Sequence, residues 1–297
     1  MSARRPAALL RDGVARLAGA GLPTPRADAR LLLAHAARMD PSGLATTREL
    51  DEPVAARYER LLVRRTAGEP VQHLTGVAWF RTIRVLVGPG VFIPRPETET
   101  VVQFALRRLV ALRPGTGPTP LVVDLCTGSG VIAAAIAEEC PGEPRIHAVE
   151  SSAEALVWAR RNLEPRGVRV VHADMAEALH ELDGRVDLVV ANPPYLPAAA
   201  AGALPADVLD HDPPEALFSG EDGLDALRVL VGAAARLLRP GGWLVAEHDE
   251  TQDGSAPRLL ADSGAFGTIE DHPDLTGRPR FVSAVRASGA RRPEVEE

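Results

Sequence analysis

The amino-acid sequence predicts an α/β protein: a mostly parallel β-sheet with helices on both faces, preceded by a small helical domain and a β-hairpin. Two observations support this fold class. From residue 121 onward, short apolar runs rich in β-branched residues alternate with helical segments, which is the pattern of parallel strands joined by helices. In residues 1–67, apolar residues recur at helical spacing instead. The length of 297 residues allows one large domain or two smaller ones.

Residues 1–67 are predicted to form the helical domain. Its helices are expected at residues 7–20, from residue 25 onward, and at residues 52–67. The basic, Ala-rich start of the chain could be mistaken for a transit peptide, but apolar residues from Leu9 to Leu17 recur at helical spacing and Asp12 interrupts the basic run. We therefore expect an amphipathic first helix. His35 is interpreted as an ordinary helix residue.

Residues 68–93 are predicted to form a β-hairpin linker. Gly68-Glu69-Pro70 interrupts the helical pattern, and strand-like apolar residues then extend from residue 71 to residue 93. The loop that follows is rigid, because prolines flank Arg95, and it precedes an acidic helix start. This is typical of a domain junction. Arg95 is interpreted as a structural ion-pair partner rather than a catalyst.

Residues 94–287 are predicted to form the α/β domain, and residues 288–297 a flexible tail. Strands are expected at residues 121–126, 145–150, 168–173, 186–191 and 243–247, with two closing strands within residues 267–287. Helices are expected at residues 98–112, 130–139, 153–162 and 223–238. Since strands and helices alternate, the carboxyl ends of the strands should meet at one edge of the sheet, where open α/β sheets bind ligands.

The composition disfavours several classes of function. A net charge of −7 and a pI near 5.7 argue against nonspecific nucleic-acid binding, which relies on a basic surface. All 33 basic residues are Arg, so no Lys can serve as nucleophile or Schiff-base former. Cys126 and Cys140 provide neither a disulfide framework nor a metal site, which predicts a reducing, cytoplasmic location. No apolar run is long enough to span a bilayer.

The first predicted strand of the α/β domain leads into residues 124–130, Asp-Leu-Cys-Thr-Gly-Ser-Gly, called the glycine loop below. Its small residues allow the backbone to approach a ligand at a helix N-terminus. A dinucleotide site would carry a third glycine, and an NTPase phosphate loop would carry Gly-Lys-Ser or Gly-Lys-Thr; neither is present. Asp124 would repel a pyrophosphate but suits an ammonium group. S-adenosylmethionine has an ammonium group, a cationic sulfonium and no phosphates, and is therefore the predicted cofactor.

Acidic residues end the next two strands at the same predicted edge of the sheet. Glu150 can accept hydrogen bonds from both ribose hydroxyls of the cofactor. Asp174 can accept one from the adenine amino group, with Met175 beside the ring. Either acid alone could be a solvated loop residue, but both lie in register with the glycine loop. Together they support an S-adenosylmethionine site.

The strand at residues 186–191 ends at Asn192-Pro193-Pro194-Tyr195, called the tetrapeptide below. Neither proline can donate a backbone hydrogen bond and each fixes its own φ, so the strand stops in a stiff loop. Asn192 adds side-chain donors and an acceptor, and Tyr195 adds a flat ring. Taken alone, the tetrapeptide is equally an ordinary strand-to-loop turn, because Asn and Pro are common turn residues.

These features together resemble the S-adenosylmethionine-dependent methyltransferases with a Rossmann-like class I sheet. The tetrapeptide resembles the motif of members that methylate planar NH₂ groups, including DNA adenine-N6 methyltransferases, so it does not choose a substrate. Nearly the whole chain resembles the PrmC/HemK family of release factor glutamine methyltransferases. The matching segments are residues 64–76, 92–99, 124–130, 212–217, 220 and 222–224, together with Arg26, Asp28 and residues 31–33 of the helical domain.

The resemblance implies transfer of a methyl group to the side-chain amide nitrogen (N5) of the glutamine in the Gly-Gly-Gln motif of peptide-chain release factors. It also implies that the helical domain helps to recognise the release factor. We expect a monomer without nucleic-acid, membrane or metal binding. The expected catalytic and substrate contacts are Asn192, Pro193, Pro194 and Tyr195, with Phe92 as a further substrate contact. The expected cofactor contacts are Asp124, Cys126, Thr127, Gly128, Ser129, Gly130, Glu150, Asp174, Met175 and Asn192.

Two residues depart from the family pattern. Cys126 stands where many members have Gly, and Met175 stands where some have Trp. The first could tighten the glycine loop and the second would change packing on the adenine, but neither removes a group that the reaction needs. Cys126 is not expected to act as a nucleophile, because methyl transfer needs none.

A glutamine amide nitrogen is a poor nucleophile, because its lone pair is delocalised into the carbonyl. We expect Asn192 Oδ1 and the Pro193 carbonyl to accept its two N–H groups, with Tyr195 packed against the amide plane, so that catalysis is mainly positioning and electrostatics. Two alternatives stay open. An N6-adenine methyltransferase acting on DNA or RNA is disfavoured by the acidic charge and the whole-length resemblance. A non-catalytic binding module is disfavoured by the intact tetrapeptide and cofactor acids.

Overall fold

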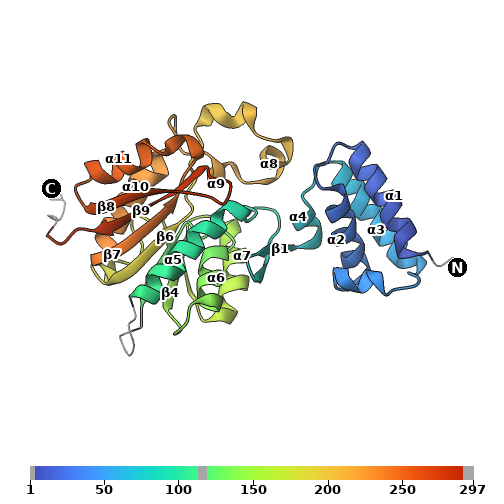
Figure 1. Ribbon diagram of the computed structural model, residues 1–297, viewed down its shortest axis with the longest axis horizontal. Helices are drawn as coiled ribbons and strands as arrows, with labels where there is room; N and C mark the ends of the chain where they lie inside the picture. The colour runs from blue at the N-terminus through green and yellow to red at the C-terminus, as the bar shows by residue number, and fades with distance from the viewer. Residues whose placement is uncertain (1–3, 113–118, 290–297) are drawn as a thin grey trace. The chain divides into compact units, whose positions relative to one another are not determined.

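The computed structural model describes residues 4–112 and 119–289 of the chain (Figure 1). The described chain forms two compact units. The first unit extends to Val77 and also includes Val87–Pro89 and Pro205–His211, and the second contains the other described residues. The predicted domain boundaries at residues 67, 93 and 287 stay predictions. Most of the predicted tail, residues 290–297, lies outside the described residues.

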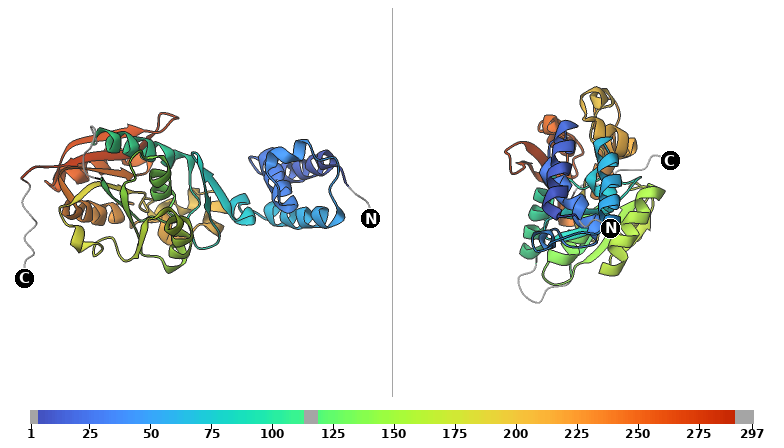
Figure 2. Two further views of the ribbon diagram at one scale, coloured as in Figure 1. Left: turned by 90° about the horizontal axis from the view of Figure 1, so that it is seen from below. Right: turned by 90° about the vertical axis from the view of Figure 1, so that its right-hand side faces the viewer.

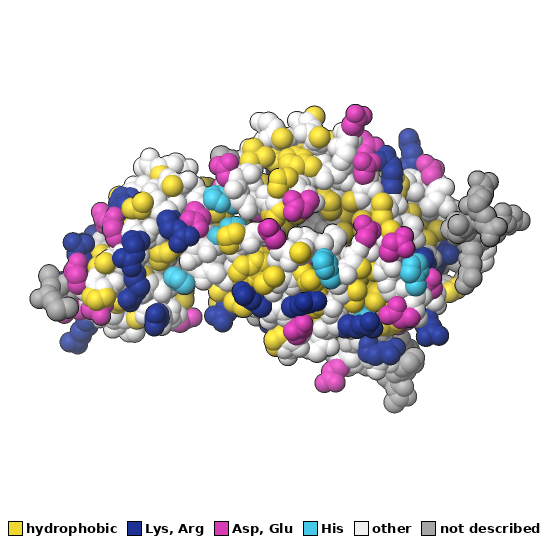
Figure 3. Space-filling model, turned by 180° about the vertical axis from the view of Figure 1, so that it is seen from behind, with side chains coloured by type: hydrophobic (Ala, Val, Ile, Leu, Met, Phe, Trp, Pro, Cys, Tyr) yellow, Lys and Arg dark blue, Asp and Glu magenta, His cyan; other side chains and the backbone are white. Residues whose placement is uncertain are grey.

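The first unit consists of short helices around an apolar centre. They are α1 (Pro6–Gly19), α2 (Pro25–Ala37), the 3-10 helix η1 (Pro41–Ala45), α3 (Glu52–Thr66) and α4 (Val71–Thr75). The helix α8 (Ala206–His211) belongs to the same unit, but none of its described side chains is part of this core. Asp51 caps α3, since its side chain accepts a hydrogen bond from Val54 N over 3.0 Å. Leu32, Tyr58 and Leu62 are fully buried in the core of this unit. Basic and acidic side chains are interspersed on the face seen in Figure 3.

The prediction that the hairpin begins at residue 71 is wrong, because Val71–Thr75 form the helix α4 rather than a strand. Val71 and Leu74 lie three positions apart and are both buried against the helical core, which favours a helical turn. Gly76 ends that turn with a φ of 73°. The hairpin itself consists of β1 (Val77–Phe80) and β2 (Ile83–Leu86), in which buried and exposed side chains alternate.

The second unit contains the predicted sheet, with the strand order β5-β4-β3-β6-β7-β9-β8. The strands are β3 (Leu121–Leu125), β4 (Arg145–Glu150), β5 (Arg169–His172), β6 (Val186–Ala191), β7 (Leu238–Glu247), β8 (Phe266–Pro273) and β9 (Pro279–Arg286). The first five are parallel, and β9 pairs antiparallel with both β7 and β8. The α/β fold class is therefore confirmed. The strand expected at residues 243–247 starts earlier, because Leu238 pairs with Val186 before a register shift.

Helices cover both faces of this sheet (Figures 1 and 2). The helices α5, α6 and α7 lie on one face, and α10 and α11 lie on the other. Their bounds are α5 (Glu99–Ala111), α6 (Val131–Glu139), α7 (Ala153–Leu163), α10 (Asp225–Leu237) and α11 (Ser255–Asp262). The short helices are η2 (Pro96–Thr98), η3 (Glu164–Arg166), η4 (His180–Leu182), η5 (Ala198–Ala203), α9 (Pro214–Leu217) and η6 (Glu250–Gln252). No helix among the described residues is long and apolar enough to cross a membrane.

The strand order brings three loops together at the carboxyl edge of the sheet. Leu125 near the end of β3 pairs with Val149 of β4 on one side and with Ala191 of β6 on the other. The glycine loop therefore lies between the loop that begins at Glu150 and the tetrapeptide. The strand order also reverses at β3, since β4 and β5 follow on one side and β6 and β7 on the other. Such a switch point is where open α/β sheets bind ligands.

Candidate functional site

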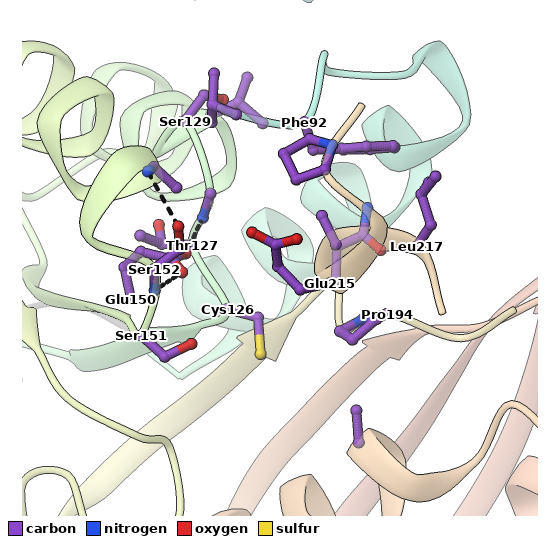
Figure 4. Close-up of a pocket in the computed structure, with 18 of the residues that line it drawn as sticks. Phe92, Cys126, Thr127, Ser129, Glu150, Ser151, Ser152, Pro194, Glu215 and Leu217 are labelled. Atoms are coloured by element: carbon purple, nitrogen blue, oxygen red, sulfur yellow. Dashed lines mark hydrogen bonds between the residues drawn. The ribbon is translucent and has the colours of Figure 1, made fainter. Parts of the chain in front are cut away.

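A cavity of about 230 Å³ opens at this edge of the second unit (Figure 4). Its wall combines the glycine loop, the start of α7, the tetrapeptide, the segment before η2 and the helix α9. Of the predicted site residues, those that line it are Phe92, Cys126, Thr127, Gly128, Ser129, Glu150, Met175, Asn192, Pro194 and Tyr195. The predicted residues Asp124, Gly130, Asp174 and Pro193 do not line it. Their contacts with cofactor or substrate stay predictions.

The glycine loop takes a tight path between β3 and α6. Cys126, Gly128 and Gly130 all have positive φ, at 58°, 56° and 83°. A Cβ on Gly130 would lie 2.6 Å from Leu163 Cγ, so only glycine fits between the loop and α7. Thr127 N donates to the carbonyl of Val149 over 3.0 Å, which fastens the loop to β4. The loop is thus preformed beside the cavity.

Asp124 lies beneath the glycine loop instead of facing the cavity. Its Oδ2 accepts hydrogen bonds from Thr127 Oγ1 (2.6 Å) and from Ala133 N (3.1 Å), whereas Oδ1 is buried with no partner among the described residues. Burial raises the pKa of Asp124 to about 7, although the two hydrogen bonds oppose that rise. In the structure, this carboxyl holds the loop against α6.

Of the acids predicted to bind the cofactor, Glu150 is the one that lines the cavity. It is 7% exposed, Oε2 accepts from Gly128 N (2.7 Å), and Oε1 accepts from Ser152 N (2.8 Å) (Figure 4). Each carboxylate oxygen can accept more than one hydrogen bond, so both oxygens remain able to bind a ligand hydroxyl. The backbone donors fix the carboxylate in one orientation. This arrangement suits the two adjacent hydroxyls of a ribose.

Met175 and Asp174 occupy different surroundings at the end of β5. Met175 lines the cavity, and its Sδ lies 3.7 Å from Cys126 Sγ. Asp174 is exposed, and its Oδ1 accepts from Ala176 N over 2.8 Å. Met175 therefore offers an apolar surface on which an adenine ring could pack. Burial raises the pKa of the neighbouring Cys126 thiol, which keeps that thiol protonated and unreactive.

Three residues of the tetrapeptide, Asn192, Pro194 and Tyr195, line the cavity. Asn192 Nδ2 donates to Thr98 Oγ1 over 3.3 Å. Because the oxygen and the nitrogen of an amide diverge from the same carbon, this bond leaves Oδ1 turned away from Thr98. Tyr195 Oη donates to Glu247 Oε1 over 3.1 Å, and burial raises the pKa of Tyr195 well above its usual value. Tyr195 is thus a neutral hydrogen-bond donor.

The segment before η2 forms the wall opposite the glycine loop. Arg95 pairs with Asp212 over 2.5 Å, and its guanidinium lies 5.1 Å from the centre of the Phe92 ring. The second oxygen of Asp212 accepts from Ile93 N over 3.2 Å. The interpretation of Arg95 as a structural ion-pair partner is confirmed. Asp212 fixes the position from which Phe92 faces the cavity (Figure 4).

The sequence-based prediction does not name several residues at this site, among them Glu215, Thr98 and Glu247. Glu215 of α9 is exposed and extends its carboxylate into the middle of the cavity (Figure 4). Thr98 also lines the cavity, whereas Glu247 lies outside its wall, and both residues are buried. Glu247 could have been found, since it ends an apolar strand just as Glu150 does. Thr98 and Glu215 lie in segments that resemble the family, but their place at the site was not predicted, because only the folded chain brings η2 and α9 to the tetrapeptide.

Two family models match the chain: the PrmC N-terminal domain over residues 8–76 and the methyltransferase small domain over residues 84–209. The chain is 49% identical over 272 residues to a release factor glutamine methyltransferase of Streptomyces coelicolor, covering 92% of this chain and 95% of the relative. A protein of the same name from Mycolicibacterium smegmatis is 44% identical over 274 residues, covering 92% and 94%. A 4-amino-L-phenylalanine/4-methylamino-L-phenylalanine methyltransferase of Streptomyces pristinaespiralis is 43% identical over 280 residues, covering 93% and 94%.

Among solved structures, the catalytic domain of hMettl16 in complex with the MAT2A 3'UTR hairpin 6 has a TM-score of 0.54 to this chain. The two are 13% identical, and the similarity covers 83% of this chain and 86% of that one. At this identity the similarity shows the fold alone, which is that of a class I methyltransferase. With the family models and the nearly full-length relatives, it confirms the resemblance drawn from the sequence: the chain belongs to the release factor glutamine methyltransferase family, whose members are S-adenosylmethionine-dependent enzymes.

Proposed function

We propose that this enzyme methylates the side-chain amide nitrogen (N5) of the glutamine in the Gly-Gly-Gln motif of peptide-chain release factors. The observation that carries the proposal is the placement of Asn192. Its Nδ2 is held by Thr98 while its Oδ1 stays available at a cavity that also contains Glu150. An amide acceptor beside a cofactor site is what a planar NH₂ substrate requires. Relatives at 49% and 44% identity carry the name release factor glutamine methyltransferase.

The residues present fit S-adenosylmethionine. Glu150 would accept from the ribose hydroxyls, the glycine loop would lie along the amino acid part, and Met175 would pack on the adenine. The bound cofactor supplies a methyl group already activated by its sulfonium. No residue therefore has to activate the methyl group, and the chain's own contribution is to position the acceptor nitrogen.

The tetrapeptide would hold the substrate amide. Asn192 Oδ1 and the carbonyl of Pro193 would accept its two N–H groups, and the ring of Tyr195 would pack against its plane. These contacts would fix the nitrogen and direct its lone pair toward the cofactor. Phe92 on the opposite wall would limit the space for the substrate side chain.

The test is transfer of labelled methyl from S-adenosylmethionine to a folded release factor, with a Gln→Ala variant of its Gly-Gly-Gln motif as the control. We expect label on the wild-type factor and none on the control. Equal label on both would place the methyl group elsewhere on the factor. Label on adenine in DNA or RNA, with none on the factor, would support the N6-adenine alternative.

A second candidate is methylation of a small aromatic amine. The relative from Streptomyces pristinaespiralis covers this chain as fully as the release factor enzymes do, and its name specifies 4-amino-L-phenylalanine. Both kinds of substrate present a flat NH₂ group, so the tetrapeptide suits either. Competition between 4-amino-L-phenylalanine and a release factor for limiting enzyme would rank the two by kcat/KM. We expect the release factor to be preferred.

Further properties belong to the same proposal. We propose that the enzyme acts as a monomer in the cytoplasm and does not bind nucleic acid directly. The net charge of −7 supports the last point. Light scattering of the purified chain, and its retention on a DNA or RNA column at low salt, would test the oligomeric state and the nucleic-acid binding.

A further inference from the structure

We propose that Glu247 is a positioning residue for methyl transfer: its buried carboxyl orients Asn192 and Tyr195, and turnover depends on whether that carboxyl is ionised. The inference rests on the proposed function, because it concerns the same tetrapeptide. Glu247 lines no part of the cavity, so it acts through its neighbours rather than on the substrate.

Glu247 lies at the carboxyl end of β7, an interior strand of the sheet. It pairs with Phe281 of β9, and Ala246 before it pairs with Ala191, the last residue of β6. Its side chain is 1% exposed. A carboxyl so deeply buried would normally have both oxygens satisfied, since desolvation without a partner is costly. Here Oε1 accepts from Tyr195 Oη over 3.1 Å, whereas Oε2 has no partner in hydrogen-bonding geometry among the described residues.

The other end of Tyr195 is held from the same part of the chain. Gln252 Nε2 donates to the Tyr195 carbonyl over 3.0 Å and to the Gly223 carbonyl over 3.3 Å. Gln252 is itself fixed by a capping box with Asp249. The two residues that hold the tyrosine, Glu247 on its hydroxyl and Gln252 on its backbone, are therefore only five positions apart in the chain. Such a two-point attachment leaves the ring little freedom to rotate.

Thr98 connects Glu247 to Asn192. Thr98 is 2% exposed, and its Oγ1 accepts from Asn192 Nδ2 over 3.3 Å. A hydroxyl that accepts one hydrogen bond still has its own proton to donate. The Thr98 hydroxyl lowers the pKa of Glu247, so it favours the ionised carboxyl. Ionisation of Glu247 therefore draws the Thr98 proton toward the carboxylate and leaves its lone pairs to Asn192.

The carboxyl of Glu247 changes its ionisation state near neutral pH. Burial raises its pKa to about 7, and the Thr98 hydroxyl, the Arg280 guanidinium and Tyr195 oppose the rise, while Glu97 adds to it. These groups come from η2, from the loop after β6, and from β9. Since the ionised carboxyl is the stronger acceptor, it holds Tyr195 and Thr98 more firmly than the protonated form does. The value of kcat should therefore rise as the pH increases through about 7.

The experiment compares Glu247→Gln with Glu250→Gln, three residues further on. Glu250 is exposed and pairs with Arg278 over 3.2 Å, so its variant controls for the loss of one carboxylate in this region. Rates of release factor methylation at saturating substrate are measured from pH 5.5 to 8.5, and S-adenosylmethionine binding is measured by calorimetry. We expect Glu247→Gln to lower kcat about tenfold at pH 8, the usual size for a lost charge-assisted hydrogen bond. The kcat of Glu247→Gln should also no longer rise near pH 7, and its Kd for S-adenosylmethionine should stay within about twofold of wild type. Glu250→Gln should match wild type in all of these quantities.

A double variant tests whether Glu247 acts through the tyrosine. If it does, adding Glu247→Gln to Tyr195→Phe should slow the enzyme by less than the product of the two single effects. Full multiplication of the effects would overturn the coupling. A Glu247→Gln enzyme that keeps wild-type kcat and the wild-type pH profile would overturn the proposal as a whole, as would a loss of cofactor affinity as large as the loss of kcat.

Thr98→Val provides a second route should Glu247→Gln fail to fold. Valine keeps the shape of threonine but removes a group that lowers the pKa of Glu247, so the rise in kcat should move to higher pH. An unmoved profile in Thr98→Val would contradict the proposal. Wild-type enzyme that transfers no methyl to any release factor would instead remove the proposed function, and the comparison of variants would then be made with 4-amino-L-phenylalanine as acceptor.

Discussion

Asn162 Nδ2 donates to the Ser129 carbonyl over 2.8 Å, so a residue of α7 holds the glycine loop in place. The same buried side chain also pairs with both backbone groups of Leu86: it donates to the carbonyl over 2.9 Å and accepts from the N–H over 2.8 Å. One amide thus connects the hairpin, α7 and the cofactor side of the cavity. The hairpin is tied to the glycine loop by this side chain.

Asn162→Ala should therefore destabilise the enzyme and weaken cofactor binding. Three hydrogen bonds are lost and their backbone partners are left unpaired, which should cost about 3 kcal/mol in the free energy of unfolding. Urea unfolding and calorimetric titration with S-adenosylmethionine would measure the two effects. Arg160→Ala, at an exposed site of the same helix, should change the stability by less than about 0.5 kcal/mol. Equal stability of the two variants would show that Asn162 has no structural role.

Gly130 and Gly128 offer a matched pair in the glycine loop. Both have positive φ, but a Cβ on Gly130 would meet Leu163 at 2.6 Å, whereas a Cβ on Gly128 would meet nothing within 4 Å. Gly128→Ala should cost about 1 kcal/mol from backbone strain alone, and Gly130→Ala should cost at least about 2 kcal/mol because α7 must also shift. Thermal unfolding of both variants would check the order. The reverse order would mean that α7 does not limit the loop.

Glu150 and Asp174 can be separated by cofactor affinity. Glu150→Gln replaces a charged acceptor that lines the cavity, so the Kd for S-adenosylmethionine should rise about 10- to 100-fold. Asp174→Asn changes an exposed side chain outside the cavity wall, and its effect should be less than about threefold. Calorimetry on both variants gives the comparison. A large loss of cofactor affinity in Asp174→Asn would support the predicted contact with the adenine amino group. It would also require the end of β5 to move when the cofactor binds.

Asn192→Ala should impair turnover far more than cofactor binding. The variant removes the acceptor that is proposed to hold the substrate amide, so kcat should fall about 100-fold or more, while the Kd for S-adenosylmethionine stays within about threefold. Steady-state methylation of a release factor and calorimetry measure the two quantities on the same preparation. If kcat and cofactor affinity fell by similar factors, Asn192 would contact the cofactor rather than the substrate.

Asp124 makes the stability of the enzyme depend on pH. Its pKa is raised to about 7 in the folded chain, above the ordinary value of 3.8, so folding favours the protonated form. The stability that this group contributes is fully present below about pH 4 and is lost as the pH rises through about 7. Urea unfolding at pH 5 and pH 8 should show a larger decrease for wild type than for Asp124→Asn. The same decrease in both would exclude Asp124 as its source.

The sequence predicted the sheet well where burial is complete. The strands β4 and β6 begin and end at the predicted residues, because each is a short apolar run that stops at a polar or proline residue. The helix α4 was missed, since five residues are too few to show helical periodicity. The early start of β7 was missed for a different reason: Pro240, Gly241 and Gly242 have the composition of a turn, and only pairing with β6 makes Leu238 a strand residue.

The site was predictable in part for the same reasons. Glu150 and the tetrapeptide follow directly from strand ends, so their meeting at the cavity is a consequence of parallel pairing. The inward turn of Asp124 was not predictable, because it depends on the hydroxyl of Thr127 and on the first turn of α6. Glu247 ends an apolar strand, so its place at this edge of the sheet was predictable. Its contact with Tyr195, and the contact of Thr98 with Asn192, were not, because they exist only in the folded chain.

The ion pair between Arg95 and Asp212 also affects how the nascent chain acquires its cofactor site. Ile93 and Asp212, which the same carboxylate joins, are 119 positions apart in the chain. A ribosome working at about 5 to 20 residues per second would add that length in roughly 6 to 24 s. By the end of this interval the growing polypeptide carries the glycine loop and the tetrapeptide, but the segment that bears Phe92 still lacks its contact with Asp212. The enzyme should therefore gain affinity for S-adenosylmethionine late in its own synthesis, once residue 212 has left the ribosome.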